Sequence, residues 1–220
     1  GRYWGDGNCR IYLKKGARFN LRTALAQAGR QGAKVTGDRV KLARIGDKAI
    51  VSICDGTGTG PRAAQESDGI TDVLVGLYQL GLEAMDAVKI LNGFWASLCC
   101  EEFPSLDVAV VYLQEGYCEF IKLGAPPSFI WGENGLTIVP AGGALLGLDG
   151  HRDPFRYGVQ LRPGDNVIMV TDGYLSHFGH QELAERLASV MSSRRKKHFV
   201  ELAEALLECA TGVSNGIKDD

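Results

Sequence analysis

The chain has 220 residues and a mass of 23.7 kDa, enough for one large domain or two small ones with a buried core. Hydrophobic residues make up 45% and charged residues 23%, which excludes disordered and fibrous classes. The net charge of -2 argues against a nucleic-acid-binding surface, which needs a basic excess. Apolar stretches such as 108–113 are too short to span a bilayer. We therefore expect no nucleic-acid partner and no direct membrane contact.

The six cysteines have no CxxC spacing and no regular framework. Cys54 and Cys118 lie in apolar runs, where free thiols behave as small hydrophobic side chains. Reduced thiols favour a cytoplasmic location. The chain begins at Gly1 without methionine and stops abruptly after two aspartates, so we expect an excised domain, with residues 1–17 as an N-terminal extension and residues 18–220 as the folded part.

The first half of the chain predicts strands followed by helices. Polar and apolar residues alternate in the first run, and Gly46-Asp47 has the composition of a tight hairpin turn. Apolar residues then recur every three or four positions, with Pro61 well placed in the first turn of a helix. The expected elements are strands at 18–28, 39–45 and 48–54 and helices at about 62–78 and 83–100.

After Pro104 the pattern changes to short strands around turn residues. Three more hairpins are expected, followed by two helices: 107–114 with 117–123, 128–131 with 136–139, 155–161 with 166–170, and helices at 181–192 and 197–210. Repeated hairpins indicate antiparallel pairing, because a parallel pair needs a crossover of a dozen or more residues. Strands and helices in separate blocks predict an α+β fold.

Acidic residues recur at or just beyond the ends of the predicted elements, mostly beside glycine. They are Asp38, Asp55, Asp172 and the terminal pair Asp219-Asp220. Each Asp-Gly dipeptide alone is more typical of a turn, and the order of the four along the chain is the informative part. Carboxylates at strand ends can bind hard cations such as Mg²⁺ and Mn²⁺, and two such ions can activate water for attack on phosphorus.

Six motifs carry a resemblance to a known family: VTGDRV, VSICDGTGTGPRAAQES, SLDVAVVYL, FIKLGAPPSFI, VIMVTDG and the final IKDD. In this order they resemble the metal-dependent protein phosphatases of the protein phosphatase 2C type, and more narrowly the SpoIIE-like bacterial phosphatases. The similarity covers residues 18–220. It implies a four-layer α-β-β-α sandwich, in which two antiparallel sheets pack face to face between helices, with two Mn²⁺ or Mg²⁺ ions at one edge.

The resemblance also assigns metal ligands one position at a time. The TGD aspartate is Asp38, and the DGxGxG aspartate is Asp55, which bridges the two metals in the family and is the catalytic centre of the motif. The carbonyl of Gly56 and the TDG aspartate, Asp172, are further ligands. The last ligand falls on Asp219. The family motif continues beyond this point, so the final strand is expected to be missing and the choice of Asp219 over Asp220 stays open.

The function implied by the resemblance is hydrolysis of phosphoserine or phosphothreonine in a protein by a water activated between two metal ions. The expected setting is a bacterial signalling pathway linked to sporulation, and the expected substrate is a small anti-anti-sigma-type phosphoprotein. No histidine falls on a family motif, so none receives a role: His151, His177, His180 and His198.

Two other functions remain open at this stage. Gly58-x-Gly60-x-x-Ala63 between a strand and a helix fits the fingerprint of a dinucleotide site and also resembles the loop of adenosylmethionine-dependent transferases. That fingerprint belongs to a parallel sheet and needs an acid about twenty residues later, where the chain has Tyr78. A phosphatase fold that binds phosphoproteins without turnover is the second alternative, although all four acids are retained.

Some charged and aromatic residues have simpler interpretations. Arg30 and Lys34 precede Asp38 and could meet a phosphate, but solvated loop charges are the more ordinary interpretation. The basic run 194–197 is interpreted as a solvated face, and Phe94 and Trp95 at helical spacing are expected in the core.

Overall fold

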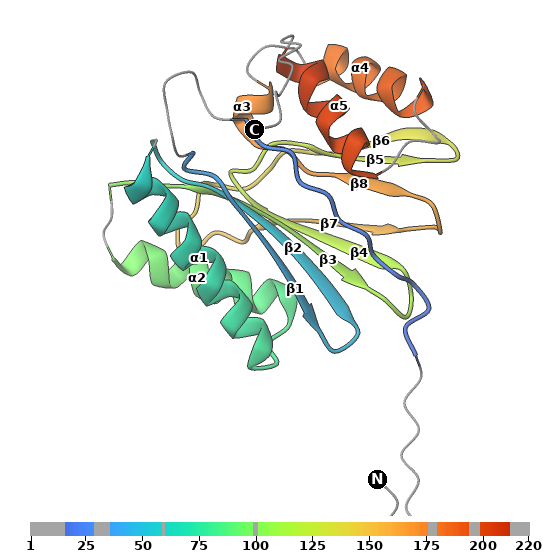
Figure 1. Cartoon of the computed structure of the whole chain (residues 1–220). Coiled ribbons are helices and arrows are strands. Elements are labelled where there is room, and N and C mark those ends of the chain that lie inside the picture. Colours follow the sequence, from blue (N-terminus) through green and yellow to red (C-terminus); the bar gives the residue numbers. More distant parts are fainter. Residues whose placement is uncertain are drawn as a thin grey trace, which may run out of the picture.

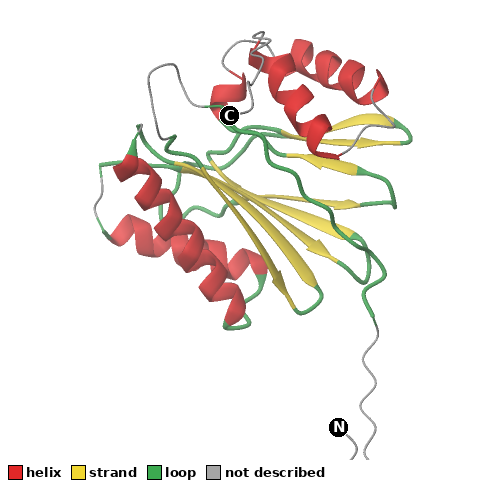
Figure 2. Ribbon diagram, in the orientation of Figure 1, coloured by secondary structure: helices red, strands yellow, loops and turns green. Residues whose placement is uncertain are grey.

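The computed structural model describes residues 16–28, 36–58, 60–98, 101–175, 180–193 and 199–211. These residues form two β-sheets that pack face to face, with helices on both outer faces (Figure 1). Figure 2 shows the four layers in order, with red helices outside and yellow strands inside. The predicted α-β-β-α sandwich is therefore confirmed.

The larger sheet has five antiparallel strands in the order β1-β2-β3-β4-β7. Its strands are β1 (Arg39–Ile45), β2 (Lys48–Asp55), β3 (Ser105–Tyr112), β4 (Tyr117–Leu123) and β7 (Phe155–Gln160). The β1–β2 hairpin turns at Gly46, whose positive φ of 62° suits glycine, and Gly116, with φ of 73°, plays the same part between β3 and β4. Both turns confirm the hairpins expected from the sequence.

The smaller sheet has three strands in the order β6-β5-β8, also paired antiparallel. They are β5 (Ser128–Gly132), β6 (Gly135–Val139) and β8 (Asn166–Ile168). Over the described residues the chain changes sheets three times: after β4 it enters the small sheet, after β6 it returns to the large sheet as β7, and after β7 it enters the small sheet again.

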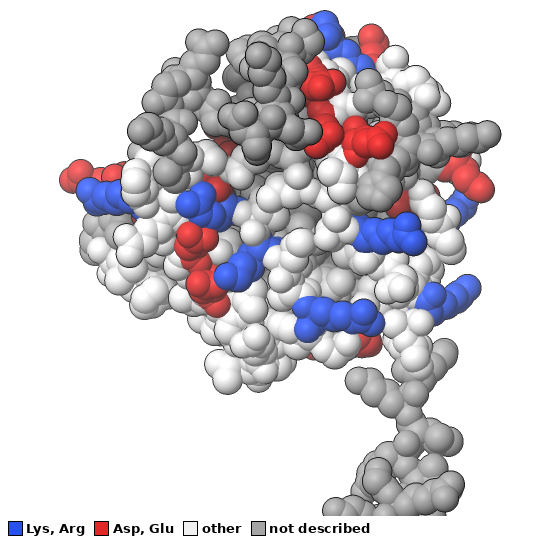
Figure 3. All heavy atoms as spheres, viewed as in Figure 1, with Lys and Arg blue, Asp and Glu red and all other residues white. Residues whose placement is uncertain are grey.

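The helices cover the two outer faces. On the large sheet lie α1 (Pro61–Gln79) and α2 (Ala84–Ser97), and on the small sheet α4 (His180–Ser193) and α5 (Phe199–Thr211), next to the single turn α3 (Asp172–Leu175) (Figure 1). Ion pairs join α1 to β1: Arg39 lies 3.0 Å from Asp68, and Lys41 contacts Asp72. Figure 3 shows basic and acidic side chains interspersed on this face of the molecule.

Three apolar clusters fill the spaces between the four layers. The first joins α1 and α2 to the large sheet through side chains such as Leu74 and Leu91. The second lies between the sheets and is centred on Phe120, and the third joins the small sheet to α4 and α5 through Phe129. Because strand side chains alternate between faces, each cluster uses every second residue of a strand. The central strands β3, β4 and β5 are thus largely buried on both faces, which accounts for their apolar runs.

Three expectations are wrong. Residues 18–28 do not pair as a strand. Near the start of this segment Phe19 packs against the cluster between the sheets, and its backbone N–H donates to the carbonyl of Leu113 at 2.9 Å. The alternation of polar and apolar residues therefore reflects an extended segment with a partly buried side chain, not a strand. Residues 155–161 and 166–170 do not form a hairpin, because β7 pairs with β4 and β8 pairs with β5 in the other sheet. Phe94 is 51% exposed rather than buried, whereas Trp95 packs against the first cluster.

The structure also describes two of the cysteines and the helices that were considered in the sequence analysis. Cys54 and Cys118 are buried free thiols, and burial raises the pKa of each to about 12, so both behave as apolar side chains. No helix in the described part of the chain combines the length and the apolar character needed to cross a bilayer.

Candidate metal centre

Two of the predicted ligands lie at the open end of the β1–β2 hairpin. Asp55 is the last residue of β2, and Asp38 immediately precedes β1. Arg39 pairs with Cys54, so extending the register by one residue places Asp38 opposite Asp55. The backbone N–H of Asp38 donates to Thr36 Oγ1 at 3.1 Å, and its carbonyl accepts from the Arg39 guanidinium at 2.8 Å. These bonds fix the backbone from which the Asp38 carboxylate projects.

Two glycines allow the chain segments at this end to approach closely. A Cβ on Gly56 would lie 2.6 Å from Ser67 Oγ and 2.9 Å from the carbonyl oxygen of Ala63, both on α1. A Cβ on Gly37 would lie 2.9 Å from the carbonyl oxygen of Gly58. Both distances to backbone oxygens are shorter than real Cβ contacts, so glycine is needed at both positions. The loop after Asp55 is thereby held between the start of α1 and the segment that carries Asp38.

The third predicted ligand, Asp172, follows a strand of the other sheet. After β8 ends at Ile168, the chain passes through the buried Val170 and begins α3 at Asp172. The hydroxyl of Tyr174 donates to the carbonyl of Leu206 at 2.6 Å, which ties this turn to α5. Asp172 therefore depends on the small sheet and its helices for its position, whereas Asp38 and Asp55 belong to the large sheet.

The structure brings these three carboxylates together. Burial, followed by the side chains of Asp38 and Asp172, raises the pKa of Asp55 to about 8. Asp55 is thus a partly buried carboxyl group with two other carboxylates as neighbours. Among the described residues, however, no three histidine, cysteine, aspartate or glutamate side chains already have the arrangement of a metal-ligand set. The acids are neighbours of Asp55, and a bound ion would have to draw them into a common coordination sphere.

The donor chemistry of this end fits hard divalent cations. Its side-chain donors are carboxylate oxygens, and the Gly56 carbonyl follows Asp55 directly in the chain. Mg²⁺ and Mn²⁺ take oxygen ligands of this kind, and a cation would offset both the burial and the neighbouring carboxylates that raise the pKa of Asp55. Asp219, the fourth predicted ligand, lies outside the described residues, as do Arg30 and Lys34.

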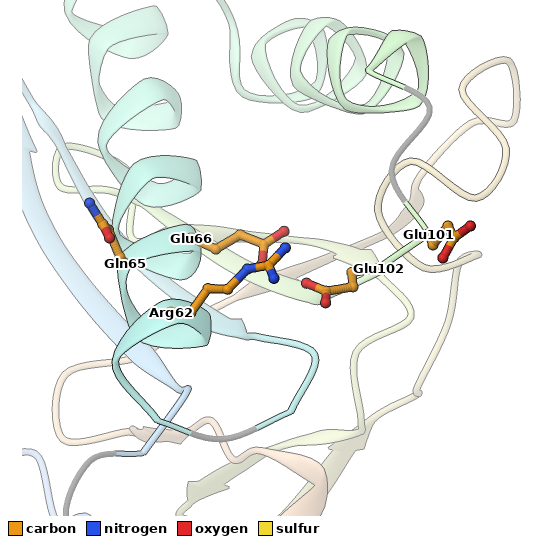
Figure 4. Close-up of a pocket in the computed structure, with 5 residues that line it drawn as sticks. All are labelled: Arg62, Gln65, Glu66, Glu101 and Glu102. Carbon is orange, nitrogen blue, oxygen red and sulfur yellow. The ribbon is translucent and has the colours of Figure 1, made fainter.

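The structure also shows a hollow that the sequence did not predict. It has a volume of about 620 Å³ and is lined by Arg62, Gln65, Glu66, Glu101 and Glu102. Figure 4 shows Arg62, Glu66 and Glu102 directed toward one another from the start of α1 and the segment before β3. Burial and the neighbouring Glu102 raise the pKa of Glu66. No spacing signal links these positions, since the two segments are far apart in the sequence.

The connection from β2 to α1 is not a dinucleotide site of the usual kind. Gly58 and Gly60 do have positive φ, at 92° and 97°, and Gly60 caps the start of α1. Both neighbours of β2, however, are antiparallel to it. The glycine fingerprint requires a parallel sheet, so its geometric basis is lacking here.

Comparison with known proteins agrees with this geometry. The family model described as "Stage II sporulation protein E (SpoIIE)" matches residues 45–220. The chain belongs to the SpoIIE family. It is 29% identical over 206 residues to stage II sporulation protein E of Bacillus subtilis (strain 168), which covers 92% of this chain but 25% of that protein. The chain thus spans about a quarter of the length of this curated relative.

Solved structures show the same fold. A structure of the PP2C phosphatase domain and part of the regulatory domain of Bacillus subtilis SpoIIE matches with a TM-score of 0.79 and 27% identity, covering 93% of this chain and 62% of that one. The RsbU and RsbW domains of Rv1364c from Mycobacterium tuberculosis match with a TM-score of 0.71 and 20% identity, covering 83% and 52%. The SpoIIE relatives are thus PP2C-type phosphatases, and the likeness to Rv1364c concerns the fold.

Proposed function

We propose that this chain is the catalytic domain of a metal-dependent protein serine/threonine phosphatase, with residues 18–220 as the domain and residues 1–17 as an extension. One observation carries the proposal: Asp55 ends a strand of the large sheet opposite Asp38 in the hairpin register. Burial, followed by the carboxylates of Asp38 and Asp172, raises its pKa to about 8. Phosphate hydrolysis on this fold needs carboxylates from separate elements at one point, and membership of the SpoIIE family supports the same activity.

Asp38, Asp55, the Gly56 carbonyl, Asp172 and Asp219 would hold two Mn²⁺ or Mg²⁺ ions, which would supply an activated water and neutralise charge on the phosphoryl group. Asp55 interacts with both of the other described acids, which supports it as the residue that would be shared between the two ions. Gly37 and Gly56 contribute by leaving no side chain between this end and α1. The contribution of the chain itself would therefore be to bring carboxylates from the two sheets to one point.

The substrate that we propose is a phosphoserine or phosphothreonine protein, of the small anti-anti-sigma type expected from the resemblance. The RsbU and RsbW domains of Rv1364c share the fold, which supports a place in a phosphorylation-controlled partner-switching pathway. We propose a cytoplasmic setting, with neither nucleic acid nor membrane as a direct partner of this domain.

The test is hydrolysis of a phosphoserine protein with and without Mn²⁺, for the wild type, Asp55→Asn and Asp153→Asn. Asp153 is a matched control, because it is an exposed aspartate paired with Lys89 at 2.7 Å on the surface. We expect Mn²⁺-dependent turnover that Asp55→Asn abolishes and Asp153→Asn leaves intact. Turnover by Asp55→Asn at the wild-type rate would overturn the assignment, and a wild type that binds the phosphoprotein without hydrolysing it would favour a binding domain.

A further inference from the structure

A buried polar network joins the two sheets. The Lys122 ammonium, from β4, donates to Asp107 Oδ2 at 2.5 Å, to Ser128 Oγ at 2.8 Å and to the Pro126 carbonyl at 2.7 Å. The Ser128 hydroxyl in turn donates to Asp107 Oδ2 at 2.8 Å. All three donors of the ammonium are therefore used. Lys122 and Ser128 are 0% exposed and Asp107 is 2% exposed, so none of these side chains can contact a substrate.

The network links strands of different sheets. Asp107 is on β3 and Lys122 is opposite it on β4, both in the large sheet, whereas Ser128 is the first residue of β5 in the small sheet. Pro126 lies in the short crossing between the sheets. Lys122 and Asp107 therefore hold both the crossing and the first residue after it. Neighbouring contacts between the sheets are apolar and less directional, such as those around Phe120.

The network also lies close, along the strands, to the candidate metal centre. Asp107 pairs with Ile53, two residues before Asp55, and side chains two apart on a strand share a face. On the small sheet, Ser128 adjoins Phe129, which pairs with Ile168, four residues before Asp172. One end of the network thus lies beside the strand that carries Asp55, and the other beside the strand that leads to Asp172.

Stability alone does not explain a buried pair of this kind. Burial lowers the pKa of Lys122 and raises that of Asp107, which reflects the cost of removing both charges from water. Apolar side chains of similar volume often replace buried ion pairs with no loss of stability. Fixed hydrogen-bond lengths and directions are what apolar packing cannot supply. Hydrogen bonds of this kind can specify how two sheets sit on one another.

We propose that Asp107, Lys122 and Ser128 are positioning residues that hold the small sheet in register on the large sheet, so that Asp172 meets Asp55 and Asp38. The inference rests on the proposed function insofar as it takes Asp172 for a metal ligand. The register itself, and the placement of Asp172, concern the protein without metal and can be measured separately.

The principal variant is Ser128→Ala, which removes the network's two hydrogen bonds to the small sheet but leaves the Lys122–Asp107 pair and the Lys122–Pro126 bond. Its matched control is Ser52→Ala: Ser52 is also 0% exposed, but it lies on β2 and takes no part in the network. We expect Ser128→Ala to weaken Mn²⁺ binding about tenfold in isothermal titration. In metal-free protein, hydrogen exchange should quicken in peptides spanning 170–175. Ser52→Ala should leave both quantities at wild-type values.

A double variant separates positioning from stability. Lys122→Met with Asp107→Leu keeps the volume buried and removes both charges, so we expect a melting temperature near that of the wild type but the weak Mn²⁺ binding of Ser128→Ala. Equal Mn²⁺ affinity and equal exchange in Ser128→Ala and Ser52→Ala would overturn the proposal. A wild type that binds no Mn²⁺ would instead overturn the metal centre, and the exchange comparison would still decide whether the network positions Asp172.

Discussion

Replacing Gly56 by alanine should destabilise the protein through a steric clash whose size follows from two distances. The added methyl group would lie 2.6 Å from Ser67 Oγ and 2.9 Å from the carbonyl oxygen of Ala63. The Ser67 hydroxyl can rotate only within a buried site, and the carbonyl belongs to the first turn of α1. Relief therefore requires α1 to move away from β2, and overpacking of this kind costs about 1–3 kcal/mol.

For a chain of this size, that cost corresponds to a fall in melting temperature of roughly 2–12 °C. The same substitution at Gly69 is the control, because this glycine lies on the exposed side of α1 with nothing within 4 Å of an added Cβ. There alanine should stabilise the helix by about 0.5–1 kcal/mol. Circular dichroism melts of both variants without metal provide the measurement. Equal melting temperatures for Gly56→Ala and the wild type would show that α1 does not press on this loop.

Three further outcomes are expected. Mn²⁺ at a hundredfold excess over its Kd should stabilise the fold by about 2.7 kcal/mol, which corresponds to a rise of roughly 5–11 °C in melting temperature. Asp172→Asn should reduce this rise. A melting temperature unchanged by ten millimolar Mn²⁺ would contradict the metal centre. Because the pKa of Asp55 is raised to about 8 on folding, its stabilising contribution is present below about pH 4 and is lost as the pH rises to 8. Without metal, the wild type should therefore lose more stability between pH 5 and 8 than Asp55→Asn does, as pH-dependent melts would show; parallel curves would refute this origin of the shift. Phe120→Ala, at a fully buried position between the sheets, should lower the free energy of unfolding in urea by about 3–5 kcal/mol. Phe94→Ala, at a half-exposed position, should lower it by less than about 1 kcal/mol. Equal losses in the two variants would contradict the difference in burial between these side chains.

Much of the fold could be predicted because its signals are local. A turn such as Gly46-Asp47 reverses the chain within a few residues, so the two strands beside it pair with one another. The turn after β7 carries a similar signal, but a turn does not specify which sheet receives the next strand. That choice depends on distant partners, since β8 pairs with β5. The strand predicted at 18–28 is wrong for a related reason. Alternation of polar and apolar residues predicts an extended chain with one buried side, but it does not specify a partner strand.

In the candidate site, too, some residues could be proposed from local sequence motifs and others could not. Asp38, Asp55 and Asp172 could be proposed from the sequence because motif residues at the ends of elements carry a recognisable order; the structure makes Asp38 and Asp172 neighbours of Asp55, and their role as metal ligands stays a prediction. The network of Asp107, Lys122 and Ser128 had no such signal. Its members come from three strands, and each one alone is an ordinary polar residue in an apolar run. Contacts of this kind become visible only when the strands are placed in two sheets.

The repeated passage of the chain between the sheets has a consequence for how the molecule is assembled. The small sheet receives β5 and β6 early, but its third strand, β8, follows only after β7 has been added to the large sheet. No single cut therefore divides the polypeptide into two fragments that each keep a whole sheet. Folding has to close long loops before either sheet is complete, which favours slow, concerted folding. Asp38 and Asp55, next to the large sheet, and Asp172, after the small sheet, should therefore come together in the same folding step and separate in the same unfolding step.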